Sequence, residues 1–464
     1  MPPAPEQHPP AEAIRVVDTV LVHPAPPSPP ETSLPLTFFD IFWLHAPPVQ
    51  RVLFYRLDAG ADVDAIISNL RDSLSQALHA FYPLAARLRL SPGTANRYEL
   101  HYRPGDAVAF TVAEYNDDID SLAADEPREV FKLAPLAPPL PEGVEGGTVL
   151  ALQASGLALG VTVHHAACDG AASTHFLHTW AACCAGTTTG TQPPPVPPVI
   201  DRTLISDPTG LYDVHCPKAA PTTTEDDTKN KSVSDHLFAT FVLSRAHLQR
   251  VKDLVAAEAS RTRGVAPPPR CSSLVATLGL IWSCYQRAKP DSSTACGKTY
   301  LLFPVDHRSR TNPPLPEKYL GNCVGAALAF ASKPDLAASS GAAGLWAACA
   351  AVAASIEEVT RGPVTEIMGL LQQRFVDAAA PTAGLLTMAG SPRFRVYDLD
   401  FGFGRPAKVD VVSVARTGAI AVAESRVGDG GMEVGLALPP DGMAAFRNCF
   451  ADAIAGLDLD AGAS

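Results

Sequence analysis

The chain has 464 residues, of which 47% are hydrophobic and 18% are charged, and its formal net charge is −12 at pH 7. This length and composition exclude a disordered polymer and predict a globular protein of about two or three domains with a large core. The negative charge argues against nucleic acid as a partner, because proteins that bind nucleic acid usually present a basic surface to the phosphates.

Targeting signals and structural cysteine patterns are not visible in the sequence. There is no run of about 18 apolar residues, so we expect no membrane span. Residues 1–30 are rich in proline and contain three acidic side chains without an apolar stretch, so we expect no secretory signal. Ten cysteines are scattered without a CxxC pair. They favour reduced thiols in a cytoplasmic protein over a disulfide framework or a zinc site.

The N-terminal part predicts a tail, a strand and a long helix. Residues 1–12 are expected to be a disordered tail, and residues 24–30 a turn-rich entry. Four aromatic residues within 33–44 indicate a buried segment, and 49–57 is predicted to be a strand. Asp64 is the predicted N-cap of a helix that ends before Pro83. Its apolar stripe consists of Ile66, Leu70, Leu74, Leu78 and Phe81. Short strands are expected over 95–165.

The most informative local pattern lies at 157–170. Large apolar residues at 157, 159, 161 and 163 alternate with small or polar ones, which predicts a strand with one apolar face. His165 continues this parity, so its ring is expected to point inward. Helical spacing then returns, which predicts a helix over 171–184. An inward histidine at a strand-to-helix turn, four residues before Asp169, is arranged like a general base. A buried structural histidine bonded to a carbonyl remains the alternative.

The second half predicts a further α/β domain. Residues 185–198 are rich in Thr, Gly and Pro, and 221–235 are polar without apolar periodicity, as in a crossover loop. The predicted elements after it are strands at 236–243, 299–305 and 323–331 and helices from Ser244 and at 272–288, 345–359 and 364–377. Strands at 394–402, 409–414, 418–426 and 432–438 predict an antiparallel sheet before a last helix. We therefore expect an N-terminal lobe at 13–205, a crossover loop at 206–235 and a C-terminal lobe at 236–464.

Three blocks resemble the plant BAHD acyltransferases. His164–Gly170 fits HHxxxDG, which resembles the chloramphenicol acetyltransferase-like superfamily. Asp400–Pro406 resembles the DFGWG block, with Phe403 where Trp is usual, and Tyr319–Cys323 resembles the YFGNC block of the anthocyanin and flavonoid branch, with Leu320 in place of Phe. Segments 34–40, 201–205, 305–310, 391–394 and 423–426 agree with that branch in the same order.

This resemblance implies an α/β (α+β) fold of two chloramphenicol acetyltransferase-like lobes, each a mixed sheet with flanking helices. An active-site channel would run between the lobes with His165 midway. The implied enzyme is an acyl-CoA-dependent acyltransferase in which His165 takes a proton from the acceptor hydroxyl and later protonates the CoA thiolate. No acyl-enzyme is needed. Cys168 is a disfavoured alternative nucleophile, because it occupies a variable position of the motif.

The resemblance also implies supporting roles around the histidine. Asp169 would pair with Arg308 and fix the turn that aims His165, and Asp400, with Arg310 as its suggested partner, would fix a loop. Gly402 and Gly404 would supply backbone freedom to that loop. His164 would be structural.

Several residues are implied to contact the substrates. Ser391 would lie near the developing oxyanion, and Phe403, Thr37 and Phe39 are expected on the substrate side. For CoA, Ser272 and Ser273 would lie at a helix N-terminus, which suits a phosphate. Lys252 and Arg245 would add positive charge, with a solvated helix face as the alternative. We expect no metal at His175 and His178, which match a ligand pair by spacing only, and no permanently bound cofactor.

The branch uses either malonyl-CoA or hydroxycinnamoyl-CoA to acylate sugar hydroxyls, often at the 6-position, of flavonoid and anthocyanin glucosides. Blocks at 34–44, 201–210 and 391–394 are more similar to the malonyl users, so we favour malonyl-CoA, with a hydroxycinnamoyl donor as the alternative. A malonyl carboxylate needs a cation, preferably arginine. Residues 170–200 contain neither Arg nor Lys. The candidates for this clamp are Arg393, Arg395, Arg405, His175 and His178.

Two remote alternatives belong to other classes. One is a non-catalytic family member that acts as a partner protein, and the other is a peptide-synthetase condensation domain, which shares HHxxxDG. The intact motif blocks argue against both. We expect a monomer that binds a small-molecule glycoside and acyl-CoA and has no nucleic-acid or membrane partner.

Overall fold

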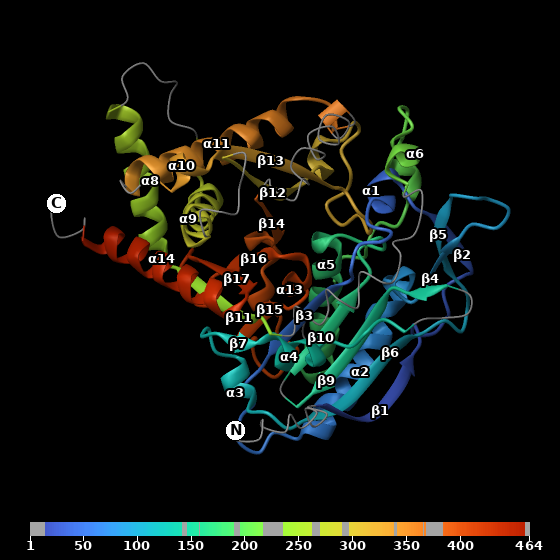
Figure 1. The fold of residues 1–464 in the computed structure, drawn as a ribbon. Coiled ribbons are helices and arrows are strands. Elements are labelled where there is room, and N and C mark those ends of the chain that lie inside the picture. Colours follow the sequence, from blue (N-terminus) through green and yellow to red (C-terminus); the bar gives the residue numbers. More distant parts are fainter. Residues whose placement is uncertain are drawn as a thin grey trace, which may run out of the picture.

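The computed structural model describes residues 14–459, apart from 142–145, 157, 190–194, 217–234, 262–269, 290–296, 338–340, 365 and 368–383. Two large sheets lie next to each other, and a smaller sheet flanks the N-terminal one (Figure 1). Helices α2 (Val63–Ala80) and α5 (Gly170–Thr189) lie with the N-terminal sheet, and the C-terminal helices gather around the other sheet (Figure 1).

The first sheet has six strands in the order β1-β6-β9-β10-β3-β15. Their bounds are β1 Ile14–Val22, β6 Val108–Tyr115, β9 Leu150–Ser155, β10 Ala158–Val163, β3 Val49–Phe54 and β15 Lys408–Val411. Strand β10 pairs antiparallel with both β9 and β3. The apolar stripe of α2 packs with α5 and this sheet in one core, whose largest side chains include Trp180 and Phe110. Because β10 is central and buried, the turn that follows it is held firmly.

The second sheet has seven strands in the order β13-β12-β14-β16-β17-β11-β7. Their bounds are β13 Val324–Ser332, β12 Lys298–Asp306, β14 Leu385–Gly390, β16 Ala419–Glu424, β17 Met432–Leu438, β11 Leu237–Leu243 and β7 Arg128–Glu129. The helices that pack with it are α8 Arg245–Arg261, α9 Ser273–Ala288, α11 Gly341–Arg361 and α14 Pro440–Leu459. Residues Ala342–Arg361 are long and apolar enough to pass as a membrane span, but one face of this helix, with Leu345, Val352 and Val359, belongs to the second core.

The two large sheets exchange strands. Strand β15 comes from the C-terminal part of the chain and pairs with β3 in the first sheet, whereas β7 comes from the N-terminal part and pairs with β11 in the second. The exchanged strands are joined by a buried ion pair in which Arg128 Nη1 lies 2.7 Å from Asp410 Oδ2. Lys408, also buried, pairs with Asp125. Each lobe therefore contributes backbone to the other, and the lobes cannot part without breaking a sheet.

The remaining elements are short. The third sheet has the order β2-β5-β4-β8, with β2 Thr32–Pro35, β5 Tyr98–Tyr102, β4 Arg87–Leu90 and β8 Gly147–Thr148. The short helices are α1 Phe38–Ile41, α3 Ile119–Leu122, α4 Val130–Leu133, α6 Leu211–His215, α10 Lys333–Leu336 and α13 Val414–Thr417.

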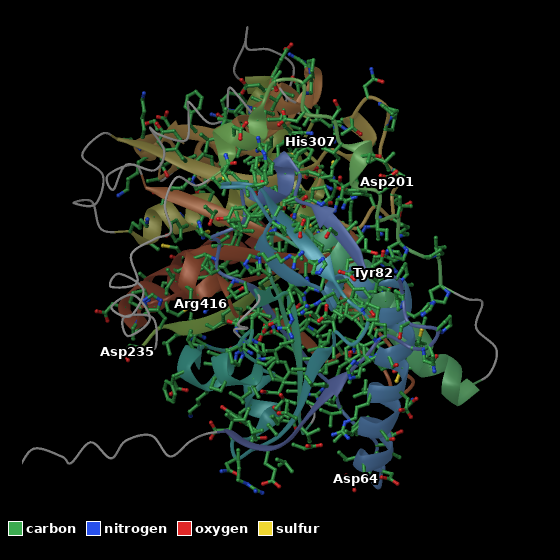
Figure 2. The ribbon with its side chains drawn as sticks, turned by 90° about the vertical axis from the view of Figure 1, so that its right-hand side faces the viewer. Asp64, Tyr82, Asp201, Asp235, His307 and Arg416 are labelled. Carbon is green, nitrogen blue, oxygen red and sulfur yellow. The ribbon has the colours of Figure 1, made fainter. Side chains whose placement is uncertain are left out.

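The start of α2, marked by Asp64, lies at the far end of the molecule from His307 and Asp201 (Figure 2).

Several predicted elements differ from the structure. The side chain that caps α2 is Asp62, which accepts a hydrogen bond from the Ala65 amide, and Asp64 lies in the first turn. The predicted strand at 394–402 is wrong: residues 392–394 and 396–398 form 3₁₀ turns, because Pro392 and the left-handed Arg395 (φ 54°) interrupt an extended chain. Strand β15 leaves the predicted antiparallel sheet for the other lobe. The tail at 1–12, most of the crossover loop (217–234) and most of the helix at 364–377 lie outside the described residues.

Candidate active site

His165 lies in a turn between β10 and α5. The alternation of apolar residues continues as far as His165, but strand β10 ends at Val163. His165 therefore lies in the turn and is not a strand residue. The turn at 164–167 is closed by a hydrogen bond from the Ala167 amide to the His164 carbonyl. Asp169 then accepts a hydrogen bond from the Ala172 amide and starts α5 as a cap does. The histidine is therefore carried by a short, fixed turn and is only partly buried.

The ring of His165 stacks on the indole of Trp43. The ring centroids lie 3.8 Å apart and the planes differ by 13°. Trp43 follows α1 and belongs to the aromatic segment at 33–44, so the stacking places that segment over the turn that carries His165. Burial lowers the pKa of His165 below its usual 6.5, because the imidazolium loses water. At neutral pH the ring is therefore uncharged and can accept a proton.

Asn322 fixes which nitrogen of His165 carries the hydrogen. Its Nδ2 donates to the carbonyl of His165 at 2.8 Å and to Asp40 Oδ1 at 2.9 Å, and both of those partners only accept. The amide orientation is thus determined, and Oδ1 faces the ring Nδ1 of His165 at 3.2 Å. Since Oδ1 can only accept, Nδ1 must hold the hydrogen and Nε2 is left with a free lone pair. That tautomer is the one that a general base needs.

Asp40 and Arg202 hold Asn322 in place. Asp40 is fully buried and also accepts a hydrogen bond from the Asn322 amide at 3.0 Å. Arg202 Nη1 lies 3.0 Å from Asp40 Oδ2, and Arg202 is buried too. The other Asp40 contacts come from Thr37, whose amide and hydroxyl donate at 2.8 and 2.7 Å. Segments 34–40, 201–205 and 319–323 therefore meet behind the histidine in one hydrogen-bonded unit.

The expected pair between Asp169 and Arg308 is present. Arg308 Nη1 and Nη2 donate to the two carboxylate oxygens at 2.8 and 3.0 Å. The same carboxylate accepts from the amides of Ala172 and Cys323 at 3.0 Å each. These four hydrogen bonds occupy the carboxylate, so its geometry fits a support of the turn better than a proton relay. Its charge still raises the pKa of His165, against the larger effect of burial.

Other groups near the turn are unsuited to catalysis. Burial strongly raises the pKa of the Cys168 thiol, which disfavours the thiolate that a nucleophile requires. His164 Nδ1 accepts a hydrogen bond from the Ala166 amide, and burial lowers its pKa to about 4. The described residues contain no group of three or more side chains that could hold a metal ion.

The DFGFG block forms a loop that supports the core. Asp400 does not pair with Arg310. Its Oδ1 accepts hydrogen bonds from the amides of Gly402 and Gly404 at 2.8 and 3.0 Å, and these glycines have φ of 95° and 105°, which favour glycine. Arg310 instead donates to the Asp306 carbonyl. Phe403 packs edge-on against Tyr55, with centroids 5.0 Å apart, so it lies in an aromatic cluster.

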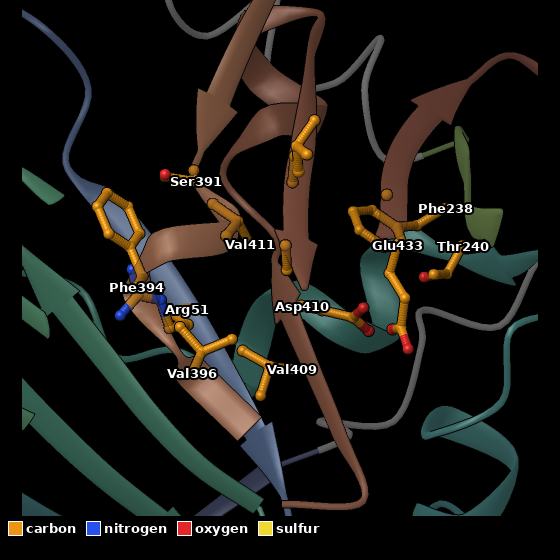
Figure 3. Close-up of a pocket in the computed structure, with 15 residues that line it drawn as sticks. Arg51, Phe238, Thr240, Ser391, Phe394, Val396, Val409, Asp410, Val411 and Glu433 are labelled. Atoms are coloured by element: carbon orange, nitrogen blue, oxygen red, sulfur yellow. The ribbon is translucent and has the colours of Figure 1, made fainter. Parts of the chain in front are cut away.

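A pocket lies between the two large sheets, with Ser391 in its wall. Its lining comes from β3, β11, β15, β16, β17 and the 390–396 segment, and includes Arg51, Phe394, Asp410 and Glu433. Figure 3 shows Ser391, Phe394 and Arg51 on one side of the pocket and Glu433 on the other. Ser391 Oγ accepts a hydrogen bond from the Arg393 amide at 3.2 Å, so its own hydrogen is free to point elsewhere.

Two other residues that were expected on the substrate side, Thr37 and Phe39, are outside this pocket lining. The Thr37 hydroxyl donates to Asp40, and Phe39 is 1% exposed in the core.

The expected CoA residues are partly brought together. Ser272 caps α9 by accepting from the Val275 amide, and Lys252 Nζ donates to Ser273 Oγ at 2.9 Å. Arg245 is exposed at the start of α8, beside the hairpin turn at Gly430. Lys252 thus places a positive charge at the N-terminus of a long helix, an arrangement that suits a phosphate.

The expected carboxylate clamps are poorly placed. Arg395 and Arg405 are exposed and both pair with Asp398, at less than 4 Å. Arg393 is exposed as well and is outside the pocket lining. His175 Nε2 binds the Val196 carbonyl at 2.9 Å, and burial lowers its pKa to about 4, so it carries no charge at neutral pH. His178 Nε2 binds the Phe394 carbonyl at 3.0 Å.

Four residues of the site were not identified from the sequence: Asn322, Asp40, Arg202 and Trp43. All four lie in segments whose resemblance is visible, yet only the three-dimensional contacts give them roles. A polar residue within an apolar block, such as Asp40 between Phe39 and Ile41, was the available signal, because a buried carboxylate requires partners.

Comparison with known proteins gives a consistent result. The model of the Transferase family matches residues 13–453. The chain is 34% identical to phenolic glucoside malonyltransferase 1 of Arabidopsis thaliana, over 92% of this chain and 94% of that protein. It is 32% identical to malonyl-CoA:anthocyanidin 5-O-glucoside-6''-O-malonyltransferase of the same plant, over 94% and 98%. It is 29% identical to coumaroyl-CoA:anthocyanidin 3-O-glucoside-6''-O-coumaroyltransferase 1 of that plant, over 93% and 96%.

A solved structure shows the same fold. The crystal structure of vinorine synthase matches with a TM-score of 0.69 at 22% identity, over 93% of this chain and 96% of that one. The expected α/β fold class with mixed sheets is thereby confirmed.

Proposed function

The chain belongs to the Transferase (BAHD) family and is an acyltransferase, and on that premise we propose that it moves a malonyl group from malonyl-CoA to a sugar hydroxyl of a phenolic or anthocyanin glucoside. The observation that carries the chemistry is the hydrogen bond between Asn322 Oδ1 and His165 Nδ1, which leaves Nε2 as a base. The choice of donor and acceptor is supported by the two malonyltransferase relatives. We propose the 6-hydroxyl as the acylated position, supported by the relative that is named a 6''-O-malonyltransferase.

The proposed reaction needs one base and no covalent enzyme intermediate. His165 Nε2 accepts the proton of the sugar hydroxyl while the oxygen attacks the thioester carbonyl. The imidazolium that forms is stabilised by Asn322 Oδ1 and by the fields of Asp169 and Asp40. When the tetrahedral intermediate collapses, the C–S bond breaks and the imidazolium returns its proton to the CoA thiolate. A positioned base of this kind contributes about 10²–10⁴-fold in rate.

A second donor class is supported by one relative and one feature of the sequence. The coumaroyltransferase relative is only slightly less similar than the malonyltransferases, and α5 carries no Lys or Arg that could bind a donor carboxylate. Hydroxycinnamoyl-CoA is therefore the candidate to test against malonyl-CoA. We also propose that the protein is a monomer. A cytoplasmic location is proposed as well, and it is supported by the nine described cysteines, which are all free.

A donor–acceptor matrix analysed by mass spectrometry tests the proposal. Malonyl-CoA, acetyl-CoA and coumaroyl-CoA are offered against anthocyanin, flavonol and simple phenolic glucosides. A malonyl mass gain on the sugar, abolished in His165→Ala, is the expected result. If only coumaroyl-CoA gives a mass gain, the donor is a hydroxycinnamoyl-CoA and the malonyl assignment is wrong. If His165→Ala transfers acyl groups at the native rate, the histidine is not the base.

A further inference from the structure

Arg51 is a buried cation without a carboxylate partner. It lies in β3 and is 6% exposed. Its Nη1 has one long contact, 3.5 Å, to the hydroxyl of Thr174 in α5, and its Nε has no hydrogen-bond partner. No ion pair within 4.0 Å joins it to an acidic side chain in the part of the chain that the structure describes. A buried, unpaired guanidinium is costly for a fold, so its retention needs a reason beyond packing.

Arg51 lies next to both arms of the catalytic turn. Its Cα is paired with that of Val161 in β10, four positions before His165, and Thr174 lies in the second turn of α5 after it. Arg51 lines the same pocket as Ser391 and Phe394 (Figure 3). The ring of Phe394 in turn lies against Gly170, where a Cβ would be 2.6 Å from Phe394 Cζ. Two lining residues of the pocket, Arg51 and Phe394, therefore contact the strand and the helix on either side of the turn that carries His165, although His165 itself does not line the pocket.

The two acids that line this pocket pair with other cations. Asp410 pairs with Arg128, and Glu433 pairs with Arg426 and accepts a hydrogen bond from Tyr397. Glu424, which is outside the pocket lining and whose Oε2 has no hydrogen-bond partner among the described residues, raises the pKa of Arg51 from beyond ion-pair distance. Burial lowers the pKa of Arg51 to about 10, which still leaves it charged at neutral pH. Among the described residues, Arg51 is thus a cation of the pocket lining that forms no ion pair, although the charge of Glu424 acts on it from a distance.

We propose that Arg51 binds the free carboxylate of the malonyl donor, and that this pocket is where the acyl group is recognised. This inference rests on the proposed function. A guanidinium can bind a carboxylate with two parallel hydrogen bonds. The Thr174 hydroxyl, which accepts from Arg51, keeps its own hydrogen to donate to the same group. The clamp thereby comes from β3, which supplies the cation that α5 lacks.

The test compares donors that differ only in the terminal carboxylate. Binding of malonyl-CoA and acetyl-CoA is titrated by calorimetry in His165→Ala, so that no turnover occurs, and kcat/KM is measured for both donors with His165 intact. Arg51→Gln is expected to lower the affinity for malonyl-CoA and kcat/KM with malonyl-CoA by about 10- to 100-fold, which corresponds to the loss of one charge-assisted hydrogen bond. The affinity and kcat/KM for acetyl-CoA should stay within about 3-fold of the native values. Arg51→Lys should recover part of the loss.

Controls separate this inference from its premise and from misfolding. Arg447→Gln changes an exposed arginine paired with Glu126 and should alter neither donor. Arg51→Gln removes an uncompensated buried charge and should unfold at an unchanged or higher temperature. If the native enzyme uses malonyl-CoA and Arg51→Gln keeps its preference for it, the inference is overturned and the proposed function stands. Loss of that preference in Arg393→Gln instead would also overturn it. A native enzyme that does not use malonyl-CoA would overturn both.

Discussion

Asn322 holds His165 at two points, since its Nδ2 donates to the main-chain carbonyl at 2.8 Å and its Oδ1 lies 3.2 Å from the ring Nδ1. One amide thus fixes both the position of the residue and its tautomer. In this site a neutral amide has the orienting role that a carboxylate has in the Ser-His-Asp triad. The carboxylate of the motif, Asp169, is occupied by Arg308.

Replacement of Asn322 by Ala should lower kcat more than it changes KM. Without the amide, the ring can rotate and populate the tautomer with hydrogen on Nε2, and we expect a loss of about 10²-fold in kcat. Steady-state kinetics with the best acyl donor measures this. Asn96→Ala, an exposed asparagine bonded to Asp213, is the matched control. Native kcat in Asn322→Ala would contradict the tautomer argument.

The pH profile should report the histidine. Burial lowers the pKa of His165 below 6.5, so the base is already neutral at pH 7. Activity should therefore be constant above pH 6.5 and fall only as the pH drops through the lowered pKa, where Nε2 becomes protonated. A profile of kcat/KM from pH 5 to pH 8, with the fold monitored by circular dichroism, measures the acidic limb. A fall in kcat/KM that begins above pH 6.5 would contradict a lowered pKa of His165.

The Asp169–Arg308 pair should matter to stability as well as to rate. Asp169→Asn keeps the shape but leaves the Arg308 guanidinium buried without its counter-charge, which costs about 3–5 kcal/mol. The turn that carries His165 should loosen, and activity should fall heavily. Chemical denaturation gives the free energy of unfolding, and Arg447→Gln, which breaks a surface pair, should cost less than about 1 kcal/mol. Native stability with only a shifted pKa of His165 would favour a relay role for Asp169.

Removal of the Cys168 thiol should be tolerated. Burial raises its pKa, so the thiolate is disfavoured, and the small apolar side chain of Ala fits the same core. Cys168→Ala should keep kcat within about 3-fold, since a positioned base does not require the thiol. Intact-mass analysis of enzyme quenched during turnover should show no added acyl group. An acylated species that disappears in Cys168→Ala would establish a covalent route.

Histidines that burial keeps neutral, His164 and His307 among them, should make the fold sensitive to mild acid. Burial lowers the pKa of His164 and of His307 to about 4, whereas the unfolded chain binds protons at the usual 6.5. The unfolded state therefore takes up more protons, and stability should fall as the pH drops from about 6.5 towards 4. The slope is at most about 1.4 kcal/mol per pH unit for each histidine. Urea titrations between pH 7 and pH 5 measure it, and His307→Gln should make the slope shallower.

The sequence predicted the class of the fold and a strand-to-helix turn at His165, because the motifs and the local alternation indicate them, while the role of His165 as the base stays a prediction. The strand before His165 shows period-two alternation, and the ion pair of Asp169 with Arg308 follows from the resemblance of two motifs. The role of Asn322 was not predictable in the same way. It depends on segments near residues 40, 165, 202 and 322 meeting in space, and a single sequence shows no register between them. Arg51 looked like an ordinary polar residue of a strand, since its lack of a partner is a property of the packed interior.

The exchange of β15 and β7 between the sheets has a consequence for how this enzyme works and can be handled. Each half of the chain would expose an unpaired sheet edge if it were produced separately, so neither half should form a native-like unit by itself. The same interlock opposes a clamshell movement of the halves. Substrates would then enter and leave without a hinged opening of the two halves, so any gating would come from local loop and side-chain motion.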